Sequence, residues 1–435
     1  MSSWGLQDAS ASKISNTFLN VLSSTVLGRV AALLFVLYLA NTLPQEFYAD
    51  IMLLYGSMMA YTWIFSIGLP VYIVPNKRFL NGAYNFGIDT IIIGTITASV
   101  GCLFMIFQFI NFFELSVDTI TIIIISATIV PNTLIRIFAS HLQAAGKIKI
   151  SSRIQFLLRN ILILALCSIS YLIFEEIIFI ALAIFITHIF LILIYLLIIS
   201  FSNFKIIRKS LNSGWIKHCW QIMISGTSFQ LLMMGPSWAS TKLETIEYAF
   251  IVTVTALLSQ GFMVLTSLSS TIYPLFSELE DGMGKKNISI FFTASKLNSF
   301  LTIVFLFGAF FILEYFLLLF DEGFNDYLNQ SFIVFSSIVL YFLKGPINTF
   351  FASQKMFIYE ALFFTFGLLV FWCWIFLNNV LDATIISQGI VISFISISFF
   401  EILCFSKVVG ENVYSRSQIV LCLIMLCFIV SLGWF

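Results

Sequence analysis

The sequence contains few charged residues. Asp, Glu, Lys and Arg make up 10% of its 435 residues, against about 25% in soluble globular proteins. Apolar residues account for 60%, and the mean hydropathy over the whole length is +1.04. A soluble enzyme with one anchor helix is excluded, because apolar sequence is spread over the entire chain. The composition therefore predicts a polytopic membrane protein.

The sequence also lacks the signatures of nucleotide, metal and nucleic-acid binding. Its seven cysteines form no Cys-x-x-Cys pair, and its three histidines, His141, His188 and His218, lie on separate segments and are interpreted as packing or interface residues. The run 281–286 has neither the spacing nor the hydroxyl residue of a P-loop. Basic and acidic residues both number 21, so net charge points to no nucleic-acid partner. We expect no cofactor, no metal site and no enzymatic activity.

Long apolar runs recur along the chain. A bilayer core about 30 Å thick needs roughly 20 helical residues. Thirteen runs fit, at 15–41, 47–74, 86–110, 119–139, 154–174, 177–200, 219–239, 248–273, 290–320, 328–351, 356–378, 384–406 and 418–435. None alternates polar and apolar residues as a barrel strand does. We predict an all-α architecture with twelve transmembrane helices and a thirteenth segment at 418–435.

The placement of basic residues predicts the orientation. Fifteen Lys and Arg residues lie in alternate loops, whereas the intervening loops carry acids and only Lys242. Basic residues near helix ends are retained on the cytoplasmic side. We therefore expect a multi-pass protein with a cytoplasmic N-terminus. The first run contains Arg29 and lacks an Ala-x-Ala cleavage site, so we expect it to remain as a helix.

Short matches recur at an offset of 200–208 residues. Glu46-Phe47-Tyr48-Ala49 matches Glu247-Tyr248-Ala249, and 144–150 matches 352–358. These matches predict a duplicated six-helix unit, which is the layout of an alternating-access transporter. The predicted parts are an N-terminal bundle over 1–200, a basic cytoplasmic linker over 201–218, a C-terminal bundle over 219–408 and an additional hydrophobic segment over 409–435. We expect the linker to form an amphipathic surface helix.

Five basic residues lie inside the apolar spans: Arg29, Arg136, Arg159, Lys296 and Lys344. A basic side chain at a helix centre costs about 2.5–3.5 kcal/mol. Arg29 lies near the middle of its span, and the other four are close enough to the cytoplasmic face to snorkel to lipid head groups instead. None of the five lies on the outer side in the predicted topology. They predict a cationic cavity open to the cytoplasm and an anionic ligand, with phosphate the natural match.

Polar side chains share one face of the first, seventh and eighth predicted helices. They are Asn16, Asn20, Ser24, Gln221, Ser225, Ser228, Thr255 and Ser259. These residues fit either a cavity for a hydroxyl-rich ligand or hydrogen bonds between helices. Asp89, near the cytoplasmic start of the third helix, is the preferred candidate for ion coupling, because a carboxylate can exchange a proton or hold Na⁺. Solvation at the interface or an ion pair is the alternative for Asp89.

Several short motifs resemble a known transporter family. They are the run from Asn16 to Arg29, Leu43-Pro44-Gln45-Glu46-Phe47-Tyr48, Gly68-Leu69-Pro70, Leu142-Gln143-Ala144-Ala145-Gly146-Lys147 and Pro274-x-x-Ser277. Over residues 10–408, the sequence resembles polysaccharide transporters, in particular bacterial O-antigen flippases. These belong to the multidrug, oligosaccharidyl-lipid and polysaccharide (MOP) exporter superfamily.

The resemblance implies a MATE-like, V-shaped pair of six-helix bundles. Such a flippase moves undecaprenyl-diphosphate-linked repeat units, used in lipopolysaccharide O-antigen biosynthesis, from the cytoplasmic to the periplasmic leaflet of the bacterial inner membrane. The family's cationic lumen, thought to hold the diphosphate, agrees with the five basic residues above. The resemblance also implies the polysaccharide polymerase and the chain-length regulator as partners. The segment after residue 408 departs from the common twelve-helix form and leaves the side of the C-terminus open.

Three alternatives remain open. A multidrug or cation antiporter of the same superfamily would share the fold, but organic cations favour acids in the first or seventh helix, where this chain has Arg29 and no acid. An O-antigen polymerase, which is an enzyme, would be expected to carry a large external loop with basic residues, whereas the external loops here are short. A structural scaffold would tolerate the change Arg29→Ala.

Overall fold

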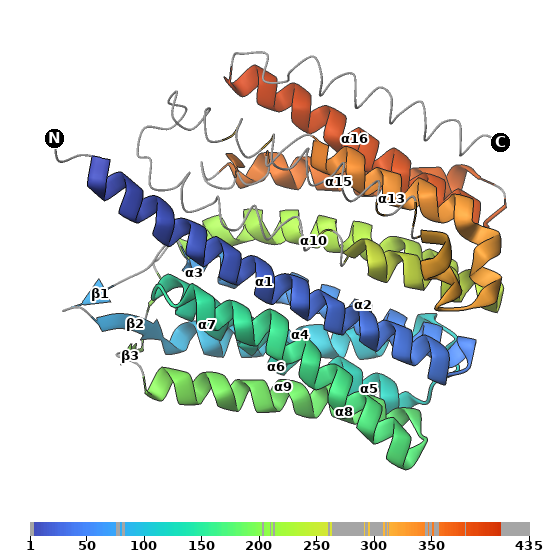
Figure 1. The fold of residues 1–435 in the computed structure, drawn as a ribbon, viewed down its shortest axis with the longest axis horizontal. Helices are drawn as coiled ribbons and strands as arrows, with labels where there is room; N and C mark the ends of the chain where they lie inside the picture. Colours follow the sequence, from blue (N-terminus) through green and yellow to red (C-terminus); the bar gives the residue numbers. More distant parts are fainter. Residues whose placement is uncertain are drawn as a thin grey trace. The chain divides into compact units, whose positions relative to one another are not determined.

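The chain is helical along most of its described length in a computed structural model (Figure 1). The structure describes residues 4–74, 79–80, 83–201, 204–208, 210–211, 214–259, 313–343, 356–378 and 380–409, with isolated positions between 262 and 351; residues 4–20 are described by their backbone. The chain divides into two compact units. Unit 1 comprises Met1–Tyr38 and Leu54–Met223, and unit 2 comprises Leu39–Leu53 and Ile224–Phe435.

Unit 1 contains most of the elements in the first half of the chain. The helix α1 covers Trp4–Thr42 and α2 covers Gln45–Phe65, and the segment Leu39–Leu53 that joins them belongs to unit 2. The other elements of unit 1 are α3 (Leu69–Ile73), β1 (Phe79–Leu80), β2 (Ala83–Gly87), α4 (Ile88–Phe112), α5 (Thr119–Ala127), α6 (Ile129–Ala144), α7 (Ile148–Ser152), the π-helical segment η1 (Arg153–Leu158), α8 (Arg159–Phe174), α9 (Ile177–Ser200) and β3 (Phe204–Ile207).

Apolar and small residues explain how these helices pack. Seven helices in the described part of the chain are long and apolar enough to cross a membrane, by length and composition. In α4, Ile96 and Leu103 are exposed, whereas Gly94, Ala98 and Gly101 are buried. The apolar stripe suits contact with lipid, and the small residues allow close packing, with Gly94 facing Ile137 of α6 and Gly101 facing Phe65 of α2.

Two predicted spans are interrupted for local reasons. The predicted helix 119–139 is divided after Ala127 into α5 and α6, because Pro131 has no N–H to donate to the carbonyl of Ala127. The predicted helix 47–74 is divided into α2 and α3, because Ile67 and Gly68 adopt φ values of 46° and 73°. A side chain at Gly68 would bring its Cβ within 2.9 Å of the carbonyl oxygen of Cys219, so this position requires glycine.

The linker at 201–218 does not form the amphipathic helix that we predicted. Its residues Phe204–Ile207 form β3, which pairs in parallel with β2, and β2 pairs antiparallel with β1. The pairing satisfies backbone groups of β3, and Phe204 contacts Tyr84 of β2 edge-on with ring centroids 5.4 Å apart. Burial raises the pKa of the Tyr84 hydroxyl, which forms a hydrogen bond of 2.9 Å with His141 of α6. The prediction was wrong because contacts with a strand distant in sequence outweigh local propensity.

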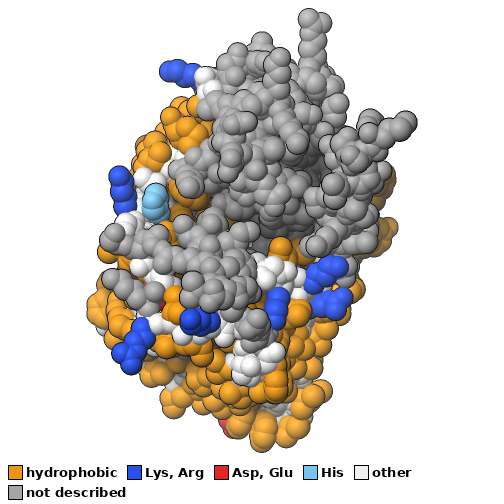
Figure 2. Space-filling view, turned by 90° about the vertical axis from the view of Figure 1, so that its left-hand side faces the viewer, with side chains coloured by type: hydrophobic (Ala, Val, Ile, Leu, Met, Phe, Trp, Pro, Cys, Tyr) orange, Lys and Arg blue, Asp and Glu red, His pale blue; other side chains and the backbone are white. Residues whose placement is uncertain are grey.

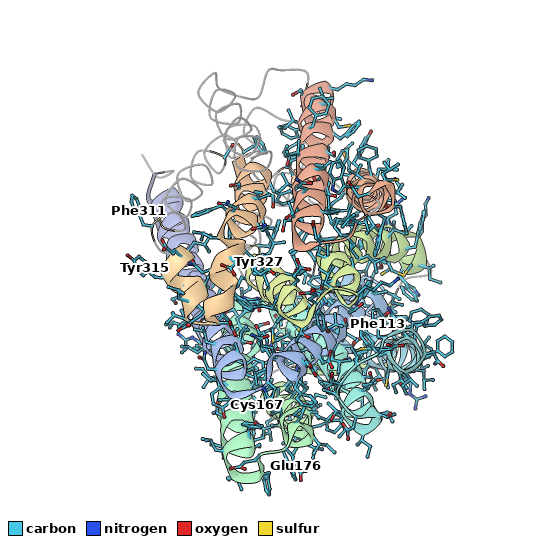
Figure 3. All side chains as sticks on the ribbon, turned by 90° about the vertical axis from the view of Figure 1, so that its right-hand side faces the viewer. Phe113, Cys167, Glu176, Phe311, Tyr315 and Tyr327 are labelled. Carbon is cyan, nitrogen blue, oxygen red and sulfur yellow. The ribbon has the colours of Figure 1, made fainter. Side chains whose placement is uncertain are left out.

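Charge differs between the two ends of unit 1. Exposed Lys149, Arg153, Lys205, Arg208 and Lys217 lie at the end that carries the strands, where Lys and Arg side chains mark the face in Figure 2. The opposite end carries the acidic loops 113–118 and 175–176, and Figure 3 shows Phe113 and Glu176 from that side. The separation agrees with the predicted alternation of basic and acidic loops. The assignment of the basic end to the cytoplasm stays a prediction.

Unit 2 contains the second half of the chain. Its described elements are α10 (Trp215–Ser240) from Ile224 onward, a helix at Thr245–Ser259, the 3₁₀ helix η2 (Glu322–Tyr327), α13 (Leu328–Leu343), α15 (Phe357–Leu377) and α16 (Ala383–Val409). Both α13 and α15 pack along α16. Tyr341 of α13 and Phe394 of α16 are in ring contact at a centroid distance of 5.5 Å, and the ring of Phe262 lies 5.0 Å from that of Phe394.

The two tyrosines paired by the sequence repeat make reciprocal contacts within unit 2. Tyr48 of α2 shares a hydrogen bond of 2.6 Å with Thr253, and Tyr248 donates one of 3.1 Å to Asp50 of α2. Each tyrosine thus reaches from the first turn of its own helix to the helix whose first turn contains the other tyrosine. The reciprocity is what a duplicated helix pair would produce.

The prediction of an all-α polytopic membrane protein is confirmed. Predicted bounds agree closely with several helices, such as 177–200 with α9 and 384–406 with α16. The predicted bundle boundary at 201–218 lies just before the change of unit between Met223 and Ile224. The predicted thirteenth segment, 418–435, lies outside the described residues.

Candidate functional site

Three of the five predicted basic residues lie in unit 1. Arg29 is on α1, Arg136 is on α6, and Arg159 is the first residue of α8. Their side chains are 7%, 7% and 4% exposed, respectively. We call them the arginine cluster. Because a buried guanidinium is expensive in a membrane protein, three in one unit indicate a functional requirement.

Arg159 is the member that links the cluster. Its charge acts on both Arg29 and Arg136, so the three side chains lie within electrostatic range through Arg159. The charge of Arg159 also acts on Tyr55 of α2, which is half-buried, and on His188 of α9, which is buried. Like charges repel each other across a low-dielectric interior. The cluster therefore creates a strong positive potential inside unit 1.

An aromatic ring offsets part of the charge of Arg136. The guanidinium carbon of Arg136 lies over the ring of Trp63 in α2, 3.2 Å from its centroid. A desolvated cation–π contact stabilises by about 2 kcal/mol. Arg29 has a longer contact, with its guanidinium carbon 6.0 Å from the ring centroid of Phe156 in η1.

Two nitrogens of the cluster are buried without a hydrogen-bond partner among the described residues. They are Nη1 of Arg136 and Nε of Arg159. The charged group that acts on Arg136 is Arg159, not an acid, within that part of the chain. An unpaired guanidinium nitrogen in the interior is costly until it meets an acceptor. Phosphate oxygens are well suited, because guanidinium groups bind them through paired hydrogen bonds.

The remaining predicted basic residues cannot be placed with the cluster. Lys296 and Lys344 lie outside the described residues. The side chains of Asn16 and Asn20 also lie outside them, although their backbone forms part of α1. Their predicted roles stay predictions.

The other predicted polar residues fall into both units. Ser24 is buried on α1, and Gln221 on α10 is half-buried; both belong to unit 1. In unit 2, Ser225, Ser228 and Thr255 are buried and Ser259 is half-buried.

The hydrogen bonds of the predicted polar residues of unit 2 distinguish contacts within the protein from hydroxyl groups that have no partner among the described residues. Ser228 shares a hydrogen bond of 2.8 Å with Thr365 of α15, and Ser259 donates to the carbonyl of Ala256 at 2.7 Å. The hydroxyl of Thr255 is buried without a partner among the described residues. The contact of Ser228 fits the alternative of hydrogen bonds between helices, whereas Thr255 retains an unused hydroxyl.

Asp89 has a structural role at the start of α4. One carboxylate oxygen accepts hydrogen bonds from the Ser210 and Leu211 backbone N–H groups, both at 2.8 Å. The other oxygen accepts from the Ser210 hydroxyl at 2.7 Å and from the Thr90 N–H at 3.1 Å. Asp89 thus holds the linker against the start of α4. Its predicted role in ion coupling stays a prediction.

Several residues of the site were not predicted from the sequence. Gly28, Tyr55, Trp63 and Asn160 surround or fasten the cluster, and His188 had been assigned to packing. Gly28 and Asn160 carried a usable signal, since each is directly next to an arginine inside an apolar run. No group of three or more metal-ligating side chains occurs among the described residues.

Comparison with known proteins identifies the fold. No family model and no curated protein sequence matches the chain. Solved transporter structures do match over nearly the whole chain. A MATE transporter in complex with MaD5 is 11% identical with a TM-score of 0.67, and covers 91% of this chain and 96% of its own. A MATE family transporter of the MOP superfamily in the outward-facing conformation is also 11% identical, with a TM-score of 0.66 and the same coverage.

A third solved structure is a MOP superfamily transporter from Pyrococcus furiosus. It is 12% identical with a TM-score of 0.67, and covers 92% of this chain and 96% of its own. That protein is described as having a binding pocket of reverse polarity that suggests a different function. The described fold of the present chain is thus the fold of these MATE-like transporters.

Proposed function

We propose that this protein is a flippase that moves undecaprenyl-diphosphate-linked oligosaccharides from the cytoplasmic to the periplasmic leaflet of the bacterial inner membrane. The observation that carries the proposal is the arginine cluster of unit 1. Buried guanidinium groups in a transporter fold favour an anionic cargo, because the nitrogens of Arg136 and Arg159 that lack a partner among the described residues are costly until an acceptor compensates them.

The chemistry of a lipid diphosphate fits this cluster. A diphosphate offers several negatively charged oxygens on two adjacent phosphorus atoms, so more than one guanidinium group can bind it at once. Nη1 of Arg136 and Nε of Arg159 would supply donors that have no other partner among the described residues. Binding would relieve the repulsion of Arg159 with Arg29 and Arg136, which lowers the free energy of the loaded state.

The other parts of the cargo need different surroundings. Hydroxyl and amide side chains would suit the sugars, and the polyprenyl chain would remain in the lipid. Alternating access of the cationic site to the two sides of the membrane would complete transfer. A cytoplasmic N-terminus would place the basic end of unit 1 on the side where the repeat units are assembled. The polymerase and the chain-length regulator would then act on the delivered units.

A multidrug or cation antiporter is the alternative, because multidrug transporters share this fold. The polarity of the site argues against it, since organic cations require acidic partners. The Pyrococcus furiosus transporter, in which reverse pocket polarity suggests a different function, provides a precedent for this reasoning.

The decisive experiment measures the sidedness of lipid-linked intermediates in cells deleted for this gene. A membrane-impermeant sugar-modifying reagent distinguishes repeat units that face the two sides. We expect single repeat units on undecaprenyl diphosphate to accumulate facing the cytoplasm, with loss of surface polysaccharide. Wild-type protein should restore transfer, and Arg159→Ala should not.

Arg153→Ala is the matched control. Arg153 lies in η1, six positions before Arg159 in the sequence, but it is exposed, so its replacement should leave transfer close to wild type. Repeat units that reach the periplasmic face unpolymerised would favour the polymerase instead. Intact surface polysaccharide with increased sensitivity to cationic drugs would favour the drug exporter.

A further inference from the structure

A π-helical segment directly precedes the cluster residue Arg159. The helix from α7 to α8 widens at η1, Arg153–Leu158, and returns to α geometry at Arg159. Such turns are rare, are less favourable than a continuous α-helix, and occur frequently at functional sites. A contact with another part of unit 1 is therefore expected to hold η1 in this form.

That contact is made by the backbone of α1 at Gly28. A Cβ atom added to Gly28 would lie 2.2 Å from the carbonyl oxygen and 2.6 Å from the carbonyl carbon of Phe156 in η1. The obstructing atoms are backbone atoms, which cannot move away as a side chain could. Only glycine allows α1 and η1 to approach this closely.

Hydrogen bonds from Asn160 stabilise the same close contact between α1 and η1. Its side chain is 4% exposed. Nδ2 of Asn160 donates to the carbonyl oxygen of Gly28 at 2.9 Å and to that of Phe156 at 2.8 Å. One amide group therefore uses both of its hydrogens to join α1 to η1.

Gly28 and Asn160, which hold α1 close to η1, are sequence neighbours of cluster arginines. Gly28 directly precedes Arg29, and Asn160 directly follows Arg159. The contact therefore fixes the backbone positions from which the two guanidinium groups extend. These groups carry like charges that act on each other, so without the fastening their repulsion would favour separation of α1 from α8.

We propose that Gly28 and Asn160 are positioning residues that hold Arg29 and Arg159 side by side, so that both can bind one diphosphate. This inference rests on the proposed function, because it assigns the fastening to the binding of the lipid diphosphate. It concerns the selectivity of the site: a fixed pair of cations favours a ligand with two linked phosphates over a single phosphate.

The test compares the binding of inorganic pyrophosphate and inorganic orthophosphate to the full-length protein in lipid nanodiscs. Isothermal titration calorimetry gives both affinities for wild type, Gly28→Ala and Asn160→Ala. We expect each variant to lose about tenfold in affinity for pyrophosphate and little for orthophosphate. Partial unfolding would lower both affinities together, so the ratio separates positioning from a general structural role.

Gly101→Ala provides a matched control in the same unit. A Cβ there would lie 2.6 Å from the ring of Phe65, away from the contact of Gly28 with Phe156, so it should leave the ratio unchanged. If Gly28→Ala does not fold, Asn160→Ala decides, because it removes atoms and adds none.

Two results would overturn the inference, and the second of them would also reject the proposed function. An unchanged ratio in Gly28→Ala and Asn160→Ala, when Arg29→Ala and Arg159→Ala both weaken pyrophosphate binding, rejects the positioning role alone. Binding of pyrophosphate that is insensitive to both arginine variants rejects the proposed function together with the inference.

Discussion

Replacement of a cluster arginine by leucine is expected to abolish transport and at the same time stabilise the protein. Arg159 is the best position for this test, because its Nε is buried without a hydrogen-bond partner among the described residues. Arg136 provides a second position with a known compensating contact, the ring of Trp63. The two variants Arg159→Leu and Arg136→Leu should therefore differ in stability by a predictable amount.

The magnitude follows from the environment of each side chain. An arginine at the centre of a membrane helix costs about 2.5–3.5 kcal/mol, whereas leucine is slightly favourable. Arg159→Leu should therefore gain up to about 3 kcal/mol in the free energy of unfolding. Arg136→Leu loses the stacking with Trp63, which contributes about 2 kcal/mol. We expect a net gain of about 1 kcal/mol for Arg136→Leu, from the difference between these two effects.

The assay combines thermal unfolding with transport. The midpoint of unfolding in one detergent and at one protein concentration should rank Arg159→Leu above Arg136→Leu and both above wild type. Both variants should fail to restore surface polysaccharide in cells deleted for the gene. Arg153→Leu serves as control, because Arg153 is exposed and its replacement should change neither property much.

A lower unfolding midpoint for Arg159→Leu would refute this reasoning. It would mean that Arg159 stabilises unit 1 through its own contacts, and that loss of transport in this variant reflects misfolding. Equal midpoints for the two leucine variants would show that the ring of Trp63 does not compensate the charge of Arg136.

Three further predictions concern the contacts around the site and the topology. Tyr48→Phe and Thr253→Val should each lower the free energy of unfolding by about 1 kcal/mol, and the double variant should lose less than the sum, because both remove one hydrogen bond. Asp89→Asn should speed tryptic cleavage of the linker in inside-out vesicles, because it weakens four hydrogen bonds, of which three hold the linker. Cysteine placed at Lys217 should react with an impermeant maleimide from the cytoplasmic side, and cysteine placed at Glu176 from the periplasmic side.

Each of these three predictions would be contradicted by a specific result. Additive losses in the tyrosine and threonine variants would show that the two hydroxyls act on separate partners. Cleavage of Asp89→Asn at the wild-type rate, with Glu114→Gln as the exposed-acid control, would mean that β3 alone holds the linker. Reversed labelling would invert the orientation, and the cationic site would then lie on the wrong side for a flippase that takes its cargo from the cytoplasm.

The positions of the helices could be predicted from the sequence because they depend on local properties. Membrane helices need long apolar runs and polar or basic ends, and both can be counted without knowledge of the fold. The predicted 177–200 and the observed α9 coincide for this reason. The interruption after Ala127 is also local, because Pro131 acts on its own helix.

The linker was not predictable in the same way. Its residues Phe204–Ile207 form a strand because β2, more than a hundred positions earlier in the sequence, offers paired backbone groups and the ring of Tyr84. The role of Asp89 has the same origin, since its hydrogen bonds reach Ser210 and Leu211. Neither contact leaves a local pattern in the sequence.

The sequence alone determined that basic side chains lie inside apolar helices, because the cost of burying charge makes each of them conspicuous. Only the tertiary structure decided that Arg159 acts on both Arg29 and Arg136 within one unit. It also decided that Trp63 covers Arg136 and that Gly28 and Asn160 fasten α1 to η1. The physical reason is that hydropathy is a property of each residue, whereas repulsion, stacking and close backbone approach depend on distances between helices that the chain order does not specify.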